Sequence, residues 1–508
     1  MTAEAFSHPI LSLEDARDFE AALFQADPVL EWDAMNRAGR SIAAAIRRDA
    51  AEIGGLGCAP RILVLAGKGN NAGDALIAAQ ALLELIPGAL CDVLFVFGPR
   101  ALRPLSLRAW QEISIAHPGR VRSLDTRDLV SSFDLCIGGI FGYQFRPPLT
   151  DSVRAAIAAA AALTIRFRVA VDLPSGIGEP GAFRADFTYA TGSVKAPSVG
   201  CANSGRLRYL DLGFFGNPAV ARFAADGEDR VILPCALDPL RGFRPASSDK
   251  RSLGHLAIIG GSARYPGSVL MATLAALRSG VGLVTSLVPE SLVPAFAAQA
   301  PEAMWIGLPE TADGDLAAAG LPRVLAGTGR ATAITVGPGL GKGAETHGLV
   351  MELVRASAVP LVIDADGLQP DVVRSGRAPR VLTPHAGELE RISAGLDLVA
   401  LARDLPHAVV VAKGPVTRVC SGESVYHSLC GGPVLSRGGS GDLLAGIVGG
   451  LLAQAPGDPL GAACRAVLWH GMAADCLARA HGQAAVRTTE VLDFLAPALR
   501  ESAVCPSC

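Results

Sequence analysis

The sequence repeats one local pattern: a short apolar run, a turn rich in glycine, asparagine or aspartate, and then an alanine-rich stretch with helical periodicity. Arg61–Ala66 (RILVLA) continues through GKGNNAGD into ALIAAQALLEL, and His255–Gly260 (HLAIIG) continues through GSARYPGS into VLMATLAALRSG. Buried strands that alternate with helices form parallel sheets with both faces covered. The pattern therefore predicts α/β domains whose ligands bind at the carboxyl ends of the strands.

The chain is long enough for more than one such domain. Its 508 residues predict two or three domains at about 100–200 residues each. The stretch between Phe215 and Ser252 has little apolar periodicity and holds a charged cluster followed by RGFRPASSDKRS. We therefore expect one three-layer α/β/α domain over residues 1–220 and a second over residues 221–508.

Charge and hydropathy argue against two classes of partner. Lys plus Arg total 45 and Asp plus Glu total 48, a net charge of −3, so no basic excess is available for a nucleic-acid backbone. The mean hydropathy is +0.36. The most apolar runs, Ala155–Ile165 and Leu443–Ala455, are nevertheless shorter than the ~18–20 residues of a membrane-spanning helix. We expect a protein that binds neither nucleic acid nor membrane.

The N-terminus and the cysteines predict a cytoplasmic location. The first twenty residues are acidic and contain no apolar signal region. The eleven cysteines are scattered and odd in number, which is typical of reduced thiols. Cys505 and Cys508 have CxxC spacing, but they supply only two of the four ligands of a structural zinc site. We expect that pair to be inert.

The C-terminal half contains a glycine-rich turn followed by an acid. Ser436–Ala445 reads SRGGSGDLLA and continues into an apolar helical pattern. Gly and Ser residues at a helix N-terminus turn backbone N–H groups toward an anion, which the helix dipole also favours. Asp442 is then placed to take a proton from a substrate hydroxyl, while the amides of Gly439–Gly441 stabilise a transferring phosphoryl group. An ordinary aspartate N-cap after a flexible loop is the alternative.

Further motifs accompany this turn in a fixed order. They are GGS at 260–262, VGPGLGKG at 336–343 (which lacks Walker A spacing), LVIDADGL at 361–368, LTPHAGE at 382–388, KGPVT at 413–417 and GGSGDLLAG at 438–446. In this order and spacing the set resembles the ribokinase-like superfamily. Within that superfamily it is most similar to ADP/ATP-dependent NAD(P)H-hydrate dehydratases, and the resemblance covers roughly residues 240–500.

The resemblance implies a ribokinase-like fold and a dehydration driven by phosphorylation. Hydrated NAD(P)H carries a hydroxyl on its damaged nicotinamide ring, and phosphorylation makes it a leaving group that the ring nitrogen lone pair expels. By resemblance, Asp442 is the catalytic base, and ADP or ATP with Mg²⁺ is the phosphoryl donor. The nucleotide would contact Lys413, Gly414, Pro415, Val416, Thr417 and Gly441. The (6S)-hydrate would contact Ser268, Gly339, His385 and Asp442.

The N-terminal half carries a second set of strand-end motifs. The glycines of Gly67–Asp74 (GKGNNAGD) are spaced one residue wider than the dinucleotide fingerprint, so this turn is no standard dinucleotide site. Val171–Ile177 (VDLPSGI) places Asp172 at a strand end and Ser175 in a turn. Asp172 is a candidate acid or base, with a turn-forming aspartate as the alternative.

Together these motifs resemble the NAD(P)H-hydrate epimerase domain, over roughly residues 12–215. The resemblance implies a Rossmann-like fold, a homo-oligomer, and interconversion of the 6R and 6S hydrates with Asp172 as the proton-transfer residue. Asn71 and Ser175 would be potassium ligands. The residues implied to hold the hydrate are Asn70, Asn71, Ala72, Gly73, Asp74 and Asp172.

This half departs from the epimerase pattern at one turn. The family's VDALFGTG becomes IGGIFGYQ at residues 137–144, so that Gly138 replaces an acid expected to bind potassium and Tyr143 enters a glycine-lined turn. Asp134 could replace that acid only if the register slipped. Two other functions therefore stay open: a dehydratase with a degenerate, non-catalytic N-terminal domain, and a small-molecule alcohol kinase of the ribokinase-like superfamily. The epimerase-like half argues against the kinase.

Overall fold

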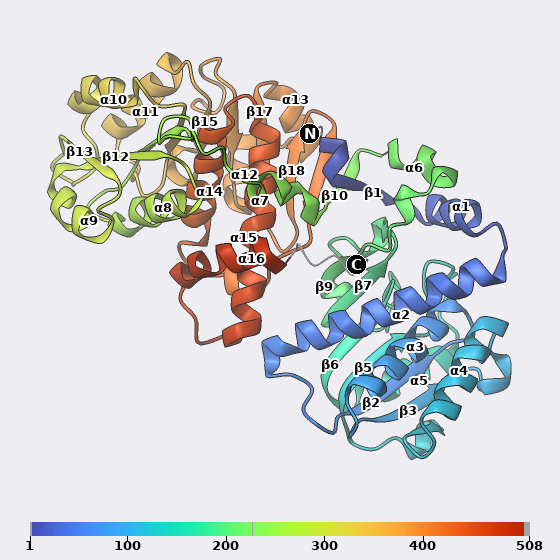
Figure 1. Cartoon of the computed structure of the whole chain (residues 1–508). Helices are drawn as coiled ribbons and strands as arrows, with labels where there is room; N and C mark the ends of the chain where they lie inside the picture. The colour runs from blue at the N-terminus through green and yellow to red at the C-terminus, as the bar shows by residue number, and fades with distance from the viewer. Residues whose placement is uncertain (1–2, 226, 502–508) are drawn as a thin grey trace.

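The structure, a computed structural model that describes residues 3–225 and 227–501, consists of two lobes (Figure 1). Cys505 and Cys508 lie outside the described residues. Each lobe has a central sheet with helices on both faces, which confirms the predicted α/β class and the three layers. Within the described residues, no helix combines the length and the apolar character needed to cross a membrane.

The N-terminal lobe is built on a seven-stranded parallel sheet. The order is β4-β3-β2-β5-β6-β7-β9. Its strands are β2 (Arg61–Ala66), β3 (Leu90–Phe95), β4 (Val121–Leu124), β5 (Ser132–Gly139), β6 (Thr164–Val171), β7 (Phe187–Thr191) and β9 (Arg206–Leu210). Chain order reverses beside β2, so the turns after β2 and β5 open side by side, where ligands bind in such sheets.

Alternate residues of β2 supply the two cores of this lobe. Ile62 and Val64 face α2 (Pro28–Ala50), α3 (Asn70–Leu85) and α4 (Pro104–Ala116), whereas Leu63 and Leu65 face α5 (Asp151–Ala161). The longest of these helices, α2, begins at residues that favour a helix start. Asp27 caps α2 by accepting from the N–H of Val29 at 2.8 Å, and Pro28 occupies the first helical position.

The C-terminal lobe holds a twelve-stranded mixed sheet in the order β13-β12-β11-β14-β15-β16-β17-β18-β19-β10-β1-β8. The first seven of these strands are parallel. They are β11 (His255–Ile259), β12 (Leu283–Pro289), β13 (Met304–Leu308), β14 (Ala333–Val336), β15 (Leu361–Ile363), β16 (Arg380–Leu382) and β17 (Ala408–Ala412). An antiparallel hairpin, β18 (Thr417–Ser421) and β19 (Ser424–Ser428), extends the sheet.

Helices cover both faces of the parallel part. One core contains residues of α8 (Pro266–Arg278), α9 (Val293–Gln299), α14 (Ser440–Gln454), α15 (Pro459–His481) and α16 (Leu495–Glu501). The other contains residues of α10 (Leu321–Thr328), α11 (Ala344–Ala356), α12 (Ala386–Ser393) and α13 (Leu398–Asp404). The apolar stretch at 443–453 that raised the question of a membrane helix is the buried middle of α14.

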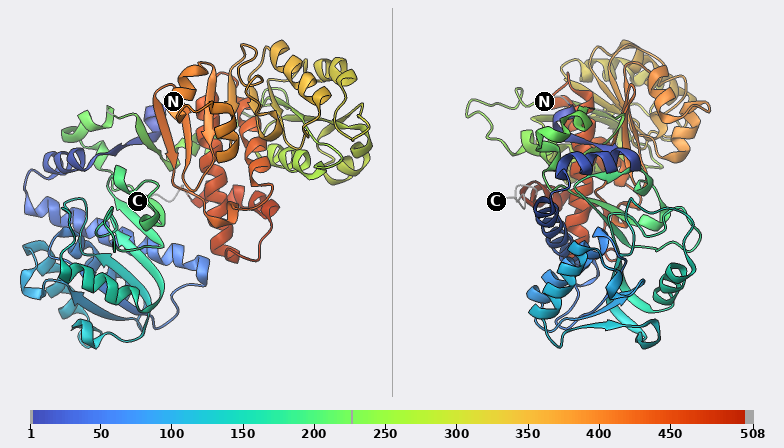
Figure 2. Two further views of the ribbon diagram at one scale, coloured as in Figure 1. Left: turned by 180° about the vertical axis from the view of Figure 1, so that it is seen from behind. Right: turned by 90° about the vertical axis from the view of Figure 1, so that its right-hand side faces the viewer.

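The last three strands of the large sheet connect the lobes. They are β10 (Asp229–Ile232), β1 (Ser7–Leu11) and β8 (Val194–Lys195). β10 pairs with β19, β1 pairs antiparallel with β10, and β8 pairs parallel with β1. Figure 2 shows the start of the chain at the same side of the C-terminal lobe as the hairpin, from which β1 is separated by β10. The large sheet therefore contains strands from both sides of residue 220.

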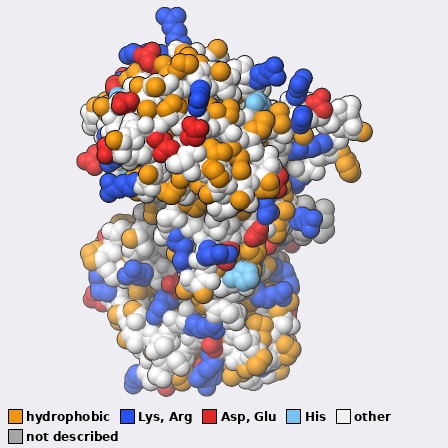
Figure 3. Space-filling view, turned by 90° about the vertical axis from the view of Figure 1, so that its left-hand side faces the viewer, with side chains coloured by type: hydrophobic (Ala, Val, Ile, Leu, Met, Phe, Trp, Pro, Cys, Tyr) orange, Lys and Arg blue, Asp and Glu red, His pale blue; other side chains and the backbone are white. Residues whose placement is uncertain are grey.

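Short helices complete the connection between the lobes. α1 (Leu13–Phe24) follows β1 and lies over the N-terminal lobe, while α6 (Ala221–Ala225) and α7 (Asp238–Arg241) flank β10 (Figure 1). α1 is capped by Ser12, whose hydroxyl accepts from the N–H of Asp15 at 3.0 Å. On the face in Figure 3, basic and acidic side chains are interspersed over both lobes.

Candidate functional sites

The glycine-rich turn of the C-terminal lobe ends at the N-terminus of α14. Gly439 is the N-cap, with φ at +89°, and a Cβ there would lie 2.5 Å from Cε of Met271, so both backbone and space require glycine. Asp442 stands in the first turn of α14. The first N–H groups of a helix have no intrahelical acceptor, so the Gly439–Gly441 amides are available to an anion.

Asp442 is tuned to exchange a proton near neutrality. Burial and the neighbouring charge of Asp364 raise its pKa to about 6, against the opposing effects of a hydrogen bond with Ser268 and the charge of Lys413. A catalytic base works best when its pKa is close to the working pH. An aspartate serving only as an N-cap has no need of a raised pKa, so this environment favours the catalytic reading.

Lys413 is held beside the turn by two acids. Its Nζ lies 3.0 Å from Oδ1 of Asp364 and 3.8 Å from Oε2 of Glu388. Burial opposes the charge of Lys413, but Asp364 and Glu388 outweigh it and raise the pKa of the lysine, so the ammonium stays charged. A Cβ on Gly441 would lie 3.2 Å from Nζ, which brings the ammonium against the helix N-terminus.

The remaining C-terminal residues lie on loops or at the first residues of helices and strands: Ser268 is in the first turn of α8. Gly339 has φ at +69°, and a Cβ there would lie 3.0 Å from Cβ of Ser268, so these two residues are neighbours. His385 caps α12: its Nδ1 accepts from the N–H of Gly387 at 3.1 Å, and its side chain is 62% exposed. Gly414, Pro415 and Val416 form the turn from β17 to β18 that follows Lys413, and Thr417 is the first residue of β18.

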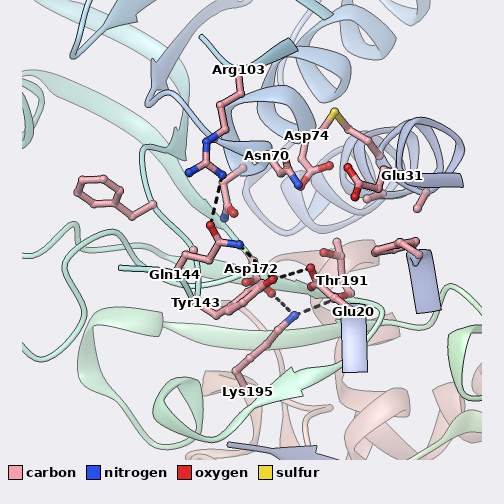
Figure 4. Close-up of a pocket in the computed structure, with 18 of the residues that line it drawn as sticks. Glu20, Glu31, Asn70, Asp74, Arg103, Tyr143, Gln144, Asp172, Thr191 and Lys195 are labelled. Atoms are coloured by element: carbon pink, nitrogen blue, oxygen red, sulfur yellow. Dashed lines mark hydrogen bonds and ion pairs between the residues drawn. The ribbon is translucent and has the colours of Figure 1, made fainter. Parts of the chain in front are cut away.

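The N-terminal lobe contains a cavity of about 190 Å³ at the carboxyl ends of its strands (Figure 4). Asn70, Asn71 and Asp74, on the first turns of α3, line it. Ala72 and Gly73 belong to the same stretch but do not line the cavity. Ala72 is fully buried in the core, and a Cβ on Gly73 would lie 2.4 Å from Sδ of Met35.

Asp172 forms a buried ion pair at the base of this cavity. Its Oδ1 lies 2.5 Å from Nζ of Lys195, and the two side chains are 6% and 2% exposed. The backbone of Asp172 has φ at +63°, a left-handed conformation that costs a non-glycine residue energy and is found mostly at functional sites. Lys195 is on β8, the strand that pairs with β1. The ion pair fixes the Asp172 carboxylate beside the Lys195 ammonium.

Asn71 and Ser175, the expected potassium ligands, both contact the turn after β5. Asn71 donates from Nδ2 to the carbonyl of Val171 at 2.9 Å, and a Cβ on Gly142 would lie 2.3 Å from its Oδ1. The Ser175 hydroxyl accepts from the N–H of Phe141 at 3.0 Å and donates to the carbonyl of Phe141 at 3.2 Å. Two neutral side-chain oxygens therefore flank the Phe141–Gly142 turn.

Gly138 leaves no room for the acid that the epimerase pattern has there. A Cβ at Gly138 would lie 2.9 to 3.1 Å from atoms of the Phe183 ring, which is 3% exposed. Asp134 does not replace that acid, because it lies near the start of β5, where its Oδ2 accepts from the N–H of Arg61 at 2.8 Å. Among the described residues, no group of three or more His, Cys, Asp and Glu side chains is arranged to hold a metal ion.

Two groups of cavity residues were not predicted. Glu20, from α1, accepts a hydrogen bond from the Tyr143 hydroxyl at 2.8 Å. Lys68 and Arg103 line the cavity as well, and Arg103 donates to Gln144 at 3.4 Å (Figure 4). The sequence held no sign that α1 reaches this cavity, whereas the basic residue inside the GKGNNAGD turn could have been read as a phosphate contact.

The comparisons with known proteins cover both lobes. A family model described as NAD(P)H-hydrate dehydratase matches residues 256–497, and one described as the YjeF-related protein N-terminus matches residues 32–196. The bifunctional NAD(P)H-hydrate repair enzyme of Gloeobacter violaceus is 36% identical over 503 residues, covering 93% of this chain and 94% of that protein. The enzyme of the same description from Moorella thermoacetica is 32% identical over 471 residues, covering 87% of each.

A solved structure is also similar to the C-terminal lobe. The ADP/ATP-dependent NAD(P)H-hydrate dehydratase from Bacillus subtilis, co-crystallized with ATP/Mg²⁺, has 26% sequence identity and a TM-score of 0.44, covering 51% of this chain and 94% of that chain.

Fold, sites and sequence relatives define a two-domain α/β enzyme class that joins a dehydratase lobe to a YjeF-type lobe. With relatives that are 36% and 32% identical and cover 93% and 87% of its length, the chain belongs to the family of bifunctional NAD(P)H-hydrate repair enzymes.

Proposed function

We propose that the C-terminal lobe dehydrates (6S)-NAD(P)H hydrate to NAD(P)H at the expense of ADP or ATP, and that the N-terminal lobe epimerises the 6R and 6S hydrates. The observation that carries the first activity is Asp442, a carboxylate with a pKa near 6 at a helix N-terminus and beside a charged lysine. The one that carries the second is the buried pair of Asp172 and Lys195 at the base of a cavity.

In the dehydratase site each residue has a separate task. Asp442 takes the proton of the ring hydroxyl, and the Gly439–Gly441 amides with Lys413 stabilise the charge that develops during transfer. Gly414–Thr417 contact the nucleotide, while Ser268, Gly339 and His385 contact the hydrate. ADP or ATP supplies the phosphoryl group that turns the hydroxyl into a leaving group.

The charged residues present are compatible with magnesium bound through nucleotide phosphates. Mg²⁺ usually takes one or two carboxylates plus phosphate oxygens and waters, and seldom an all-protein cage. Asp364 and Glu388 are the carboxylates beside Lys413. This agrees with the lack of a three-residue metal cluster among the described residues.

We propose that potassium binds the N-terminal lobe only through neutral oxygens. Asn71 and Ser175 supply an amide and a hydroxyl oxygen beside the Phe141–Gly142 turn, and hard oxygens suit such a cation. The Phe183 ring occupies the space where a carboxylate would stand at residue 138. Without that charge the affinity for potassium is lower than in an epimerase that has the acid.

The Phe183 ring also favours a second candidate function, that of a dehydratase with a non-catalytic N-terminal lobe. If potassium is indispensable for epimerisation, the loss of the carboxylate leaves a dehydratase whose N-terminal lobe only binds the hydrate. The intact Asp172–Lys195 pair and the open cavity argue for the active form.

Absorbance at 340 nm tests both activities. The full chain is given a mixture of the two hydrate epimers with ADP or ATP and Mg²⁺, with and without potassium. We expect complete recovery of NAD(P)H, faster than spontaneous epimerisation allows. Recovery of about half in a fast phase, followed by the spontaneous rate, would establish the second candidate instead.

Substitution Asp442→Asn identifies the base. We expect it to lower the dehydratase rate by about 100-fold or more, as loss of a general base does, while nucleotide binding measured by calorimetry stays close to that of the unchanged protein. Asp366→Asn is the matched control. Asp366 is two residues from Asp364 in sequence, but its carboxylate accepts from the N–H of Gly341. An active Asp442→Asn protein would reject the assignment.

A further inference from the structure

The epimerase cavity contains a second acid that the sequence motifs do not include. Glu20 comes from α1 and lies in the same group of cavity side chains as Tyr143, Lys195 and Asp172, the residue that follows β6 (Figure 4). The Tyr143 hydroxyl donates to Oε2 of Glu20 at 2.8 Å. Tyr143 is on the turn after β5, so this bond ties α1 to the sheet side of the cavity.

The charges around the cavity do not balance if every acid is ionised. Four acids (Glu20, Glu31, Asp74 and Asp172) line it against three cations (Lys68, Arg103 and Lys195), and the Lys195 ammonium lies 2.5 Å from Asp172. Burial raises the pKa of Glu20, an effect that Lys195 opposes and the charge of Asp172 reinforces. Burial, together with Asp172 and Glu20, raises the pKa of Asp74 as well. The cavity therefore places two carboxyl groups of raised pKa, Glu20 and Asp74, beside the Asp172–Lys195 ion pair.

Epimerisation at a carbon that carries a hydroxyl beside a ring nitrogen needs proton transfer in two directions. The hydroxyl departs only when it is protonated, and the ring nitrogen lone pair then forms a C=N⁺ bond. A water molecule that adds to the other face must lose a proton to restore a neutral hydroxyl. One group that donates a proton and one that accepts a proton suffice for the exchange.

We propose that Glu20 is a catalytic acid of the epimerisation, donating its proton to the departing hydroxyl while Asp172 accepts a proton from the water that adds. This assignment rests on the proposed epimerase function. The C–O bond breaks and water leaves, a new C–O bond forms on the opposite face, and Glu20 and Asp172 recover their protonation states by exchange with solvent. Tyr143 is a positioning residue that orients the Glu20 carboxyl.

A purely structural account gives Glu20 and Tyr143 another task. Their hydrogen bond would only fasten α1 to the turn after β5, and removing it would loosen the cavity without changing which groups titrate. The two accounts differ in the pH dependence of epimerisation, because an acid must be protonated to act and the rate must fall as pH rises through its pKa.

The test gives the purified 6R hydrate to the full chain with excess ADP or ATP. The dehydratase of the same chain converts each 6S hydrate that is formed to NAD(P)H, so absorbance at 340 nm reports the epimerisation. We expect Glu20→Gln to lower the epimerisation rate by about 100-fold. Glu14→Gln, an exposed acid on the same helix, is the matched control and should keep the full rate. Consumption of the 6S hydrate measures whether each protein is folded and should be equal in all of them.

Tyr143→Phe provides the readout that a structural role would not give. The tyrosine hydrogen bond lowers the pKa of Glu20, so its removal should move the alkaline limb of the epimerisation profile to higher pH. An epimerisation rate of Glu20→Gln within threefold of the unchanged protein, or an alkaline limb that stays in place in Tyr143→Phe, would overturn the role of Glu20 and leave the epimerase function standing. If the unchanged protein consumes only the 6S hydrate, both assignments fall.

Discussion

The two aspartates to which we assign proton transfer, one in each lobe, have different surroundings. Asp442 is buried near Asp364 and has a pKa of about 6, so it passes between its two forms near neutral pH. Asp172 is also buried, but its carboxylate lies 2.5 Å from the ammonium of Lys195. One aspartate therefore has another acid as its neighbour and the other has a cation, and different environments of this kind separate the roles of acids in one enzyme.

The environment of Asp442 predicts how the dehydratase responds to pH. Because the base must be ionised, kcat/KM should be constant above the pKa of about 6 and fall tenfold per pH unit below it. Asp364→Asn removes a negative neighbour, which lowers the pKa of Asp442 and should move this acid limb to lower pH. Lys413→Met removes a positive neighbour and should move it to higher pH. Rate profiles with the pure 6S hydrate measure the limb.

The decisive result is that the acid limb of the rate profile shifts in opposite directions in these two variants. A uniform loss of rate with an unmoved limb would mean that the limb belongs to another group, because Asp364 and Lys413 act on Asp442 in opposite directions. Lys413→Met should also weaken nucleotide binding, so the acid limb of this variant is measured at saturating nucleotide.

Gly138 and Phe183 together determine the proposed affinity for potassium. Gly138→Asp with Phe183→Ala should lower the half-saturating potassium concentration for epimerisation by about tenfold, the equivalent of ~1.4 kcal/mol, because it restores a carboxylate and makes room for it. Gly138→Asp alone should give no gain, since a Cβ there lies 2.9 Å from the Phe183 ring. Epimerisation rates over a potassium titration, at constant ionic strength, measure the effect.

The single substitution Phe183→Ala is the control for loss of packing. It removes a ring that is 3% exposed and should lower the melting temperature without changing the response to potassium. A single Gly138→Asp protein that matched the double variant would show that Phe183 gives way freely and that our explanation of the missing acid is wrong.

At the scale of elements, the sequence predicted the parallel strands well and the connecting strands not at all. The apolar runs at 61–66 and 255–260 are strands β2 (Arg61–Ala66) and β11 (His255–Ile259). Each is a local signal, a buried strand between turns, that needs no information from the rest of the chain. β1 (Ser7–Leu11) and β8 (Val194–Lys195) are short, and their pairing joins residues almost two hundred positions apart. No local pattern specifies such a pairing.

The same distinction separates the predicted from the unpredicted site residues. Asp172, Asn71 and Asp442 stand at strand ends or helix starts, where motif and location coincide. Glu20 reaches the cavity only because β1 binds the far sheet and directs α1 back over the N-terminal lobe. The Phe183 ring beside Gly138 is likewise a tertiary contact between segments with no common motif.

At the scale of the whole molecule, the lobes are joined by a buried ionic cluster in addition to β1. Arg206 and Arg208 of β9 lie 2.5 and 2.8 Å from Asp475 of α15 in the other lobe. Arg206 also lies 2.6 Å from Glu52, just after α2. Burial opposes the charge of Asp475, but Arg208 and Arg206 lower its pKa overall. The N–H of Gly431 donates to the same carboxylate at 3.1 Å.

We predict that this cluster makes the two lobes unfold together. Asp475→Asn leaves two buried guanidinium groups short of a counter-charge, a change that typically costs ~3–5 kcal/mol. Calorimetry should then show two unfolding transitions in place of one, and the first should occur at a lower temperature than in the unchanged protein. Arg208→Met should do the same, because it leaves Asp475 with Arg206 alone. Both substitutions remove the same interaction, the ion pair between Asp475 and Arg208. The double variant should therefore be destabilised by less than the sum of the two single variants. Strictly additive losses would show that Asp475 and Arg208 stabilise their own lobes separately, and that the sheet pairing of β1 alone holds the lobes together.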